Sequence, residues 1–174
     1  MSKIAFIFPG QGAQKTGMGK DFYEQSQRAA EIYDAASKRL KEEMEIDIRT
    51  LCFDENDKLD QTAYTQAALV TTCLAMARTL EEKGVRADVT AGLSLGEYCA
   101  IAVAGGMSDL DAVWAVRKRG VLMEEAVPTG VGAMAAVLGL SAEQIEKVTE
   151  EIKGVTVANY NCPGQVVITG ETDS

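Results

Sequence analysis

Residues Gly92 to Gly96 read Gly-Leu-Ser-Leu-Gly and place Ser94 between two glycines, directly after a short apolar run. This G-x-S-x-G pattern is typical of a nucleophile on a sharp turn from a strand into a helix. Taken alone, however, the pentapeptide favours another interpretation, in which the serine caps the start of a helix. A serine nucleophile needs a base, most often histidine, and the 174 residues contain none. If Ser94 is the nucleophile, its histidine base is therefore not among these residues.

A second polar feature is the glycine-rich segment 8–19, FPGQGAQKTGMG. A dinucleotide-binding fingerprint that starts at Gly10 fails at Lys15, and a P-loop fails because Asp21 stands where serine or threonine is required. A tight turn explains the glycines. It does not explain Gln11, whose amide follows a buried strand at the end where α/β sheets bind ligands.

Composition excludes several classes of protein. The net charge of −9, from 26 acidic and 17 basic residues, disfavours a nucleic-acid partner. The run Ile4–Phe8 is too short for a membrane span or an export signal, so we expect no membrane contact and a cytoplasmic protein. Without histidine or a C-x-x-C pair we expect no metal, and we expect reduced structural thiols at the four cysteines, Cys52, Cys73, Cys99 and Cys162.

Strands and helices alternate in the first part of the chain, which predicts an α/β fold with a parallel sheet. We expect strands at 3–8, buried on both faces, and at 87–91, which leads into Ser94. Turn-like residues occupy 53–61. The expected helices cover 19–25, 28–43, 62–83, 94–105 and 108–126.

The last part of the chain has a different pattern. Helices and strands are interrupted by Pro128, Gly130 and Gly132. We therefore divide the sequence there into subdomains 1–127 and 128–174. After this division we expect a strand at 133–140 and a helix at 141–152. We then expect two strands, at 155–160 and 165–169, joined by a turn at 161–164. This β-α-β-β order is the beginning of a ferredoxin-like unit that lacks its last helix and strand.

Several motifs, in one order, resemble those of the malonyl-CoA:acyl carrier protein transacylases, the acyltransferases that load malonyl units in bacterial fatty acid synthesis. The motifs are Pro9-Gly10-Gln11-Gly12-Ala13-Gln14, Thr65-Gln66, Gly92-Leu93-Ser94-Leu95-Gly96-Glu97-Tyr98, Arg119-Gly120-x-x-Met123 and Asn161-Cys162-Pro163-Gly164-Gln165. The resemblance implies an α/β-hydrolase-like subdomain with a ferredoxin-like insert, both incomplete in this chain. It also implies that the catalytic histidine lies beyond residue 174, on a segment that returns after the insert. Many members have histidine where Leu93 stands, so this sequence departs from the motif there. The departure does not affect the family's general base, which is the later histidine.

The resemblance assigns a role to each catalytic residue. Ser94 attacks the thioester and carries the malonyl group as an ester. The backbone N–H groups of Leu95 and Gln11 form the oxyanion hole.

Three further residues are expected to bind substrate. The guanidinium of Arg119 is expected to bind the free carboxylate of malonate. Helical periodicity does not distinguish Arg119 from Arg117, for which a solvated surface role stays open. Gln66 interrupts an apolar helix and either lines the pocket or caps a loop. Asn161 is first of all a turn residue, expected near the cleft between the subdomains.

The resemblance implies transfer of malonyl from malonyl-CoA to the phosphopantetheine thiol of acyl carrier protein, with no cofactor and no metal. Two alternatives stay open: a catalytically incompetent truncated fragment, and a serine esterase with a Ser-Lys dyad. No S-x-x-K pattern surrounds Ser94, which weighs against the esterase. The unpaired strand edges of an incomplete fold predict self-association of the isolated chain.

Overall fold

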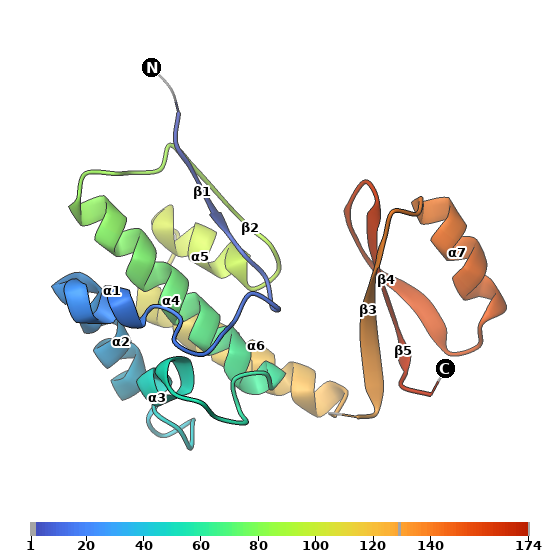
Figure 1. Cartoon of the computed structure of the whole chain (residues 1–174), viewed down its shortest axis with the longest axis horizontal. Helices are drawn as coiled ribbons and strands as arrows, with labels where there is room; N and C mark the ends of the chain where they lie inside the picture. The colour runs from blue at the N-terminus through green and yellow to red at the C-terminus, as the bar shows by residue number, and fades with distance from the viewer. Residues whose placement is uncertain (1–2, 129, 174) are drawn as a thin grey trace. The chain divides into compact units, whose positions relative to one another are not determined.

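The computed structural model describes residues 3–128 and 130–173, which form two compact units, Met1–Met123 and Glu124–Ser174 (Figure 1). The first unit is α/β and the second is a helix on an antiparallel sheet, so the expected α/β fold with two kinds of sheet is confirmed. The first unit contains β1 (Ala5–Phe8), α1 (Lys20–Gln25), α2 (Gln27–Leu40), α3 (Ile48–Phe53), α4 (Thr62–Glu82), β2 (Val89–Gly92) and α5 (Gly96–Val103). Helix α6 (Asp109–Ala126) ends this unit and leads into the second.

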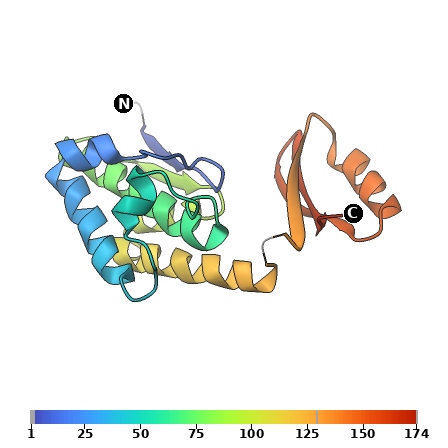
Figure 2. The same cartoon turned by 60° about the horizontal axis from the view of Figure 1, so that its bottom comes forward.

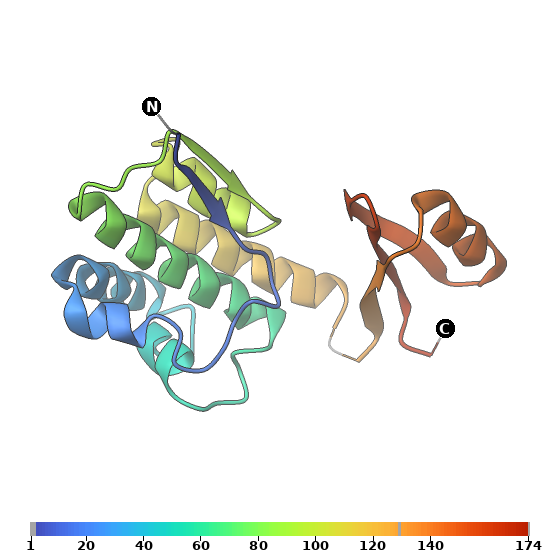
Figure 3. The ribbon, with the colours of Figure 1, turned by 45° about the horizontal axis from the view of Figure 1, so that its top comes forward.

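The sheet of the first unit is parallel. β1 pairs with β2 from Ala5 opposite Val89 to Phe8 opposite Gly92, and α5 packs on both strands (Figure 3). The expectation that β1 is buried on both faces is wrong for the described residues, since the side chain of Ile7 is 77% exposed while Phe8 is buried. The helices of the unit cover only one face of these strands.

Helix α4 is the centre of the core, as its nearly uninterrupted apolar sequence predicts. Twelve of its residues are buried, and α2 packs along it with an apolar stripe of Ala29, Ile32, Tyr33, Ala36 and Leu40. The buried Tyr33 hydroxyl hydrogen-bonds Thr72 Oγ1 at 2.7 Å and donates to the Met18 carbonyl at 3.2 Å. The long helix thereby holds the segment that follows β1.

The second unit comprises β3 (Gly132–Leu138), α7 (Ala142–Glu151), β4 (Val155–Cys162) and β5 (Gln165–Glu171). Its sheet has the order β3-β5-β4 with both pairs antiparallel, and α7 lies on one face of it, which is the arrangement of the first four ferredoxin-like elements (Figure 2). Ser141 and Gln144 form a capping box at the start of α7. The expected turn at 161–164 is too long: Cys162 still pairs with Gln165, so only two residues connect the strands.

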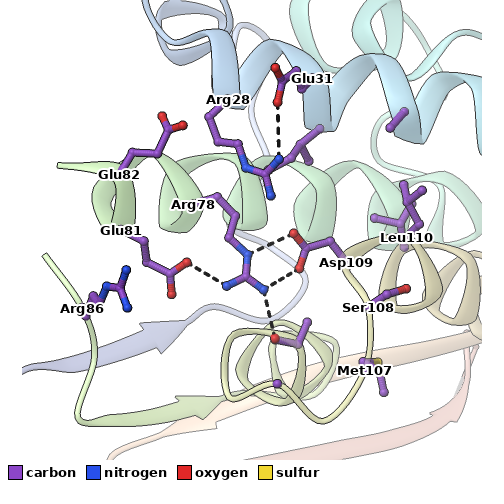
Figure 4. A pocket seen from close by; sticks show the side chains of 15 residues that line it. Arg28, Glu31, Arg78, Glu81, Glu82, Arg86, Met107, Ser108, Asp109 and Leu110 are labelled. Carbon is purple, nitrogen blue, oxygen red and sulfur yellow. Dashed lines mark hydrogen bonds and ion pairs between the residues drawn. The ribbon is translucent and has the colours of Figure 1, made fainter. Parts of the chain in front are cut away.

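A cluster of charged side chains lines a cavity of about 700 Å³ between α2, α4 and the α5–α6 junction (Figure 4). Arg78 lies at its centre and donates to both carboxylate oxygens of Asp109, at 2.7 and 3.0 Å, to Glu81 at 2.8 Å and to the Ala102 carbonyl at 3.0 Å. The guanidinium therefore ties α4 to the end of α5 and the start of α6. Because four of its five N–H donors bond within the protein, we assign Arg78 a structural role.

Replacing Arg78 with Ala is expected to lower the free energy of unfolding by about 2–4 kcal/mol, because it leaves the mostly buried Asp109 carboxylate and the α5 terminus without their donor. Arg28→Ala is the matched control in the same cavity. Its ion pair with Glu31 is exposed and should contribute less than about 0.5 kcal/mol. Urea unfolding of both variants measures the difference, and equal losses would contradict the structural role.

Candidate active site

Ser94 lies on a sharp turn between β2 and α5 that requires glycine at both Gly92 and Gly96. Its φ of 52° is the only positive value outside glycine in the part of the chain that the structure describes. A Cβ on Gly92 would lie 2.0 Å from the carbonyl carbon of Gly96, and a Cβ on Gly96 would lie 2.5 Å from the Phe8 carbonyl oxygen. The two glycines of the motif are therefore required for strand, turn and helix to pack so closely, as in a nucleophile elbow.

Ser94 does not cap the helix that follows it. The N-cap residue of α5 is Leu95, and Ser94 Oγ instead accepts a hydrogen bond from Arg119 Nη2 at 2.9 Å. The helix-cap role that the pentapeptide alone favours is therefore wrong. The residue is exposed, so its hydroxyl is accessible to a substrate.

Arg119 joins the serine to the interior of the unit. Its Nη1 donates to Gln66 Oε1 at 2.6 Å, and Gln66 Nε2 in turn lies 3.2 Å from the thioether sulfur of Met123. Gln66 is fully buried on α4, so its amide fixes one edge of the guanidinium. No carboxylate of the described residues forms an ion pair with Arg119, which leaves its charge available to a ligand.

The close packing of α6 on α4 brings these residues together. A Cβ on Gly120 would lie 2.7 Å from the Thr62 carbonyl oxygen, so the residue after Arg119 has to be glycine for the helices to approach this far. Met123 was not predicted as a site residue. Its position four residues after Arg119, on the same helical face, is the sequence signal that could have identified it.

Arg117, the other candidate in this helix, has a structural role. It is 7% exposed, donates to the backbone carbonyls of Ala63 and Glu43, and lies 4.8 Å from the ring centroid of Tyr64. The solvated surface role that the sequence left open for Arg117 is wrong. The geometry therefore distinguishes two arginines that periodicity does not.

Two backbone donors near the serine have no acceptor. Neither the N–H of Leu95 nor that of Gln11 donates a hydrogen bond to any described residue, although Leu95 is fully buried. Buried backbone donors are rarely left unpaired, so the N–H of Leu95 points to an acceptor supplied by a ligand, whereas Gln11 is exposed and its N–H is open to water as well. The Gln11 side chain turns to Thr62 Oγ1 at 3.1 Å, and this contact fixes the loop after β1.

The remaining predicted residue, Asn161, belongs to the second unit. It lies in strand β4 rather than in a turn, and its amide donates to Gln165 Oε1 at 3.1 Å. Of the six predicted residues, the structure therefore joins Ser94, Arg119 and Gln66 directly through hydrogen bonds.

Among the described residues, the site contains an exposed serine hydroxyl, a guanidinium and backbone N–H donors, but no base. The one described side chain bonded to Ser94 is Arg119, which cannot accept a proton, and no described lysine hydrogen-bonds the serine as a Ser-Lys dyad would require. Within 3–128 and 130–173, no cluster of three or more histidine, cysteine or acidic residues could hold a metal ion. Over the same residues, every helix is too short or too polar to cross a bilayer.

Comparison with known proteins identifies relatives along the whole chain. The acyl transferase domain family matches residues 5–174. The malonyl CoA-acyl carrier protein transacylase of Bacillus subtilis is 50% identical over 175 residues, which cover 98% of this chain and 54% of that protein. This chain spans about half the length of the curated relatives it matches.

Solved structures agree with these relatives. The crystal structure of the malonyl CoA-acyl carrier protein transacylase from Clostridium perfringens is similar with a TM-score of 0.87 and 42% identity, over 98% of this chain and 54% of that one. A malonyl-transacylase in complex with a type II PKS acyl-carrier protein is similar with a TM-score of 0.88 and 38% identity, over 99% of this chain and 56% of that one.

The backbone strain at Ser94 gives a prediction that is independent of activity. Ser94→Gly should be more stable than Ser94→Ala by about 0.5–1 kcal/mol, because glycine adopts a positive φ without the cost that alanine retains. At the exposed helical position Glu97 the order should reverse, with Ala above Gly by about 1 kcal/mol. Thermal and urea unfolding of the four variants compare the pairs, and the same order at both positions would contradict a strained elbow.

Proposed function

The chain belongs to the acyl transferase domain family, and we propose that it supplies the nucleophile and the acyl-binding arginine for transfer of malonyl from malonyl-CoA to the phosphopantetheine thiol of acyl carrier protein. The single observation that carries this proposal is the hydrogen bond between Arg119 and Ser94, next to the buried amide of Gln66. The partners come from the relatives, whose names contain malonyl-CoA and acyl carrier protein.

The proposed reaction has two steps that pass through a malonyl-serine ester. Ser94 Oγ attacks the thioester carbonyl, and the resulting oxyanion accepts hydrogen bonds from the free N–H groups of Leu95 and Gln11. Each such donor typically contributes about 2.7–4 kcal/mol of transition-state stabilisation. Collapse of the intermediate expels the CoA thiolate, and the carrier protein's thiol then attacks the ester and releases Ser94.

Arg119 limits which acyl group fits. Its guanidinium lies within hydrogen-bond distance of the nucleophile itself, so a carboxylate bound to it must be close to the carbonyl under attack. In malonyl, one methylene separates the two groups. A carboxylate can replace Ser94 as the partner of Nη2, while Gln66 continues to hold Nη1. An acetyl group has no carboxylate with which to make this exchange.

The general base in this proposal is a histidine outside the 174 residues, which contain none. No cofactor is needed, because the nucleophile, the oxyanion donors and the carboxylate-binding group are all protein groups. We propose a cytoplasmic location, which matches the use of CoA thioesters and carrier protein. Asn161 is retained as a proposed contributor to substrate binding.

Incubation of the full-length protein with malonyl-CoA is expected to leave one malonyl group on Ser94, because this hydroxyl is exposed and lies beside the free oxyanion donors. Intact mass and peptide mapping detect the adduct. Ser94→Ala should abolish it. An adduct on a cysteine, or one that persists in Ser94→Ala, would contradict the assignment.

Replacing Arg119 with Ala in the full-length protein should lower malonyl transfer by about 10²-fold or more, since a charge-assisted pairing worth roughly 3 kcal/mol is lost. Acetyl transfer should be unchanged or faster, because that substrate never used the pairing. Lys118→Ala removes a charge from the adjacent, half-exposed position and should leave both rates near wild type. Parallel assays with both thioesters test the proposal, and equal losses for malonyl and acetyl would refute it.

A further inference from the structure

The loop that follows β1 lies directly against the serine elbow. A Cβ on the buried Gly10 would lie 3.2 Å from the Leu93 carbonyl oxygen, and the Leu93 N–H donates to the Phe8 carbonyl at 3.0 Å. The next residue of this loop is Gln11, whose N–H is one of the two backbone donors near Ser94 that bond to no described residue. The direction of this N–H therefore depends on how the loop is held.

Two side-chain amides tie the loop to the start of α4. The first is the amide of Gln11 itself, which donates to Thr62 Oγ1 at 3.1 Å. The second is the amide of Gln14, whose Oε1 accepts a hydrogen bond from the Gly12 N–H at 2.7 Å and whose Nε2 donates to Asp60 Oδ1 at 2.9 Å. Gln11 is thereby held twice, through its own side chain and through the peptide that follows it.

Asp60 is a fixed point for the second tether, although its side chain is exposed. The residue before it, Leu59, is buried, and the Leu59 carbonyl accepts a hydrogen bond from Thr65 Oγ1 at 2.5 Å. The residue after it, Gln61, is the N-cap of α4, and the Gln61 N–H donates to the Lys58 carbonyl at 3.0 Å. The Asp60 carboxylate is therefore attached to backbone that the first turn of α4 holds in place.

We propose that Gln14 and Asp60 are positioning residues for the acylation of Ser94, because their hydrogen bond holds the loop so that the Gln11 N–H points at the oxyanion. This inference rests on the proposed function, in which that N–H stabilises the oxyanion. A donor of this kind contributes only when it is aimed at the place where the charge develops. The Leu95 N–H is aimed by the start of α5, whereas the Gln11 N–H belongs to a loop and depends on the side chains that tether it.

Helix α4 also holds the acyl-binding side of the site. Gln66, one turn after Thr62, binds the guanidinium of Arg119, and Asp60 directly precedes the same helix. The oxyanion loop and the guanidinium are therefore positioned by one rigid element but through separate contacts. Loss of the Gln14–Asp60 tether should lower the rate of acylation without weakening the binding of the malonyl carboxylate, which depends on Arg119.

The test exchanges the donor and the acceptor of the Gln14–Asp60 hydrogen bond in the full-length protein. In Gln14→Glu the new carboxylate still accepts from Gly12, but it faces Asp60 with no hydrogen between them, and like charges this close repel. We expect the rate constant for acylation of Ser94 at saturating malonyl-CoA to fall about 10-fold, a part of the about 10²–10³-fold that loss of an oxyanion donor costs. The half-saturating concentration of malonyl-CoA should stay unchanged.

The rescue variant is Gln14→Glu with Asp60→Asn, in which the new amide donates to the new carboxylate. Most of the lost rate should return in this double variant. Asp60→Asn alone keeps an oxygen acceptor for Gln14 and should slow acylation far less than Gln14→Glu does. Gln27→Glu is the matched control, because Gln27 Nε2 donates to Glu31 Oε1 at 3.1 Å in the same kind of exposed amide–carboxylate pair on α2, and it should leave acylation unchanged.

Equal acylation rates in Gln14→Glu and the wild type would overturn the positioning role. The same conclusion would follow from a higher half-saturating concentration at an unchanged rate constant, or from equal slowing in the single and double variants. Absence of any malonyl adduct on the wild-type protein would instead count against the proposed function, and the positioning role would fall with it.

Discussion

The contact between the first turn of α5 and the end of β1 is the constraint from which the site follows. With the Gly96 backbone against the Phe8 carbonyl oxygen, there is space for a helix to start directly at the edge of the parallel sheet. Ser94 is forced to a positive φ by this turn, which exposes its hydroxyl and leaves the Leu95 N–H without an intrahelical acceptor. A conformation that costs stability is thus found at the residue proposed as the nucleophile.

A second constraint is the burial of Gln66 in an otherwise apolar helix. A buried amide has to find partners, and here they are the guanidinium of Arg119 and the sulfur of Met123, both on α6. The polar residue therefore fixes the relative position of α4 and α6 at the point where α6 delivers its arginine to the elbow. The opposite face of the same helix uses Arg117 to bind backbone carbonyls, so one helix holds one structural and one site arginine.

The sequence predicted the parts of this arrangement that depend on local pattern. The extent of α4 and the glycines of the elbow follow from spacing along the chain, and the structure confirms them. The role of Arg117 could not be predicted, since its carbonyl partners are more than fifty residues away. The exposure of Ile7 depends on what covers a sheet face, which strand composition does not reveal. The placement of Asn161 in a strand depends on cross-strand register rather than on its own turn propensity.

The hydrogen bond from Arg119 also determines how Ser94 can be activated. A hydroxyl has two acceptor lone pairs and one proton, and the guanidinium occupies a lone pair without taking the proton. The serine O–H is therefore free to be donated elsewhere, while the adjacent positive charge stabilises the alkoxide that develops as the proton leaves. No described residue accepts this proton, so the base in the proposed mechanism has to approach from a side of Oγ that Arg119 leaves open. In the proposed mechanism, the malonyl carboxylate replaces Ser94 as the partner of Nη2 and neutralises the charge next to the serine. Binding of the malonyl carboxylate to Arg119 in this mechanism thus frees the lone pair of Ser94 Oγ from the guanidinium, whereas a substrate without a carboxylate leaves the two residues hydrogen-bonded.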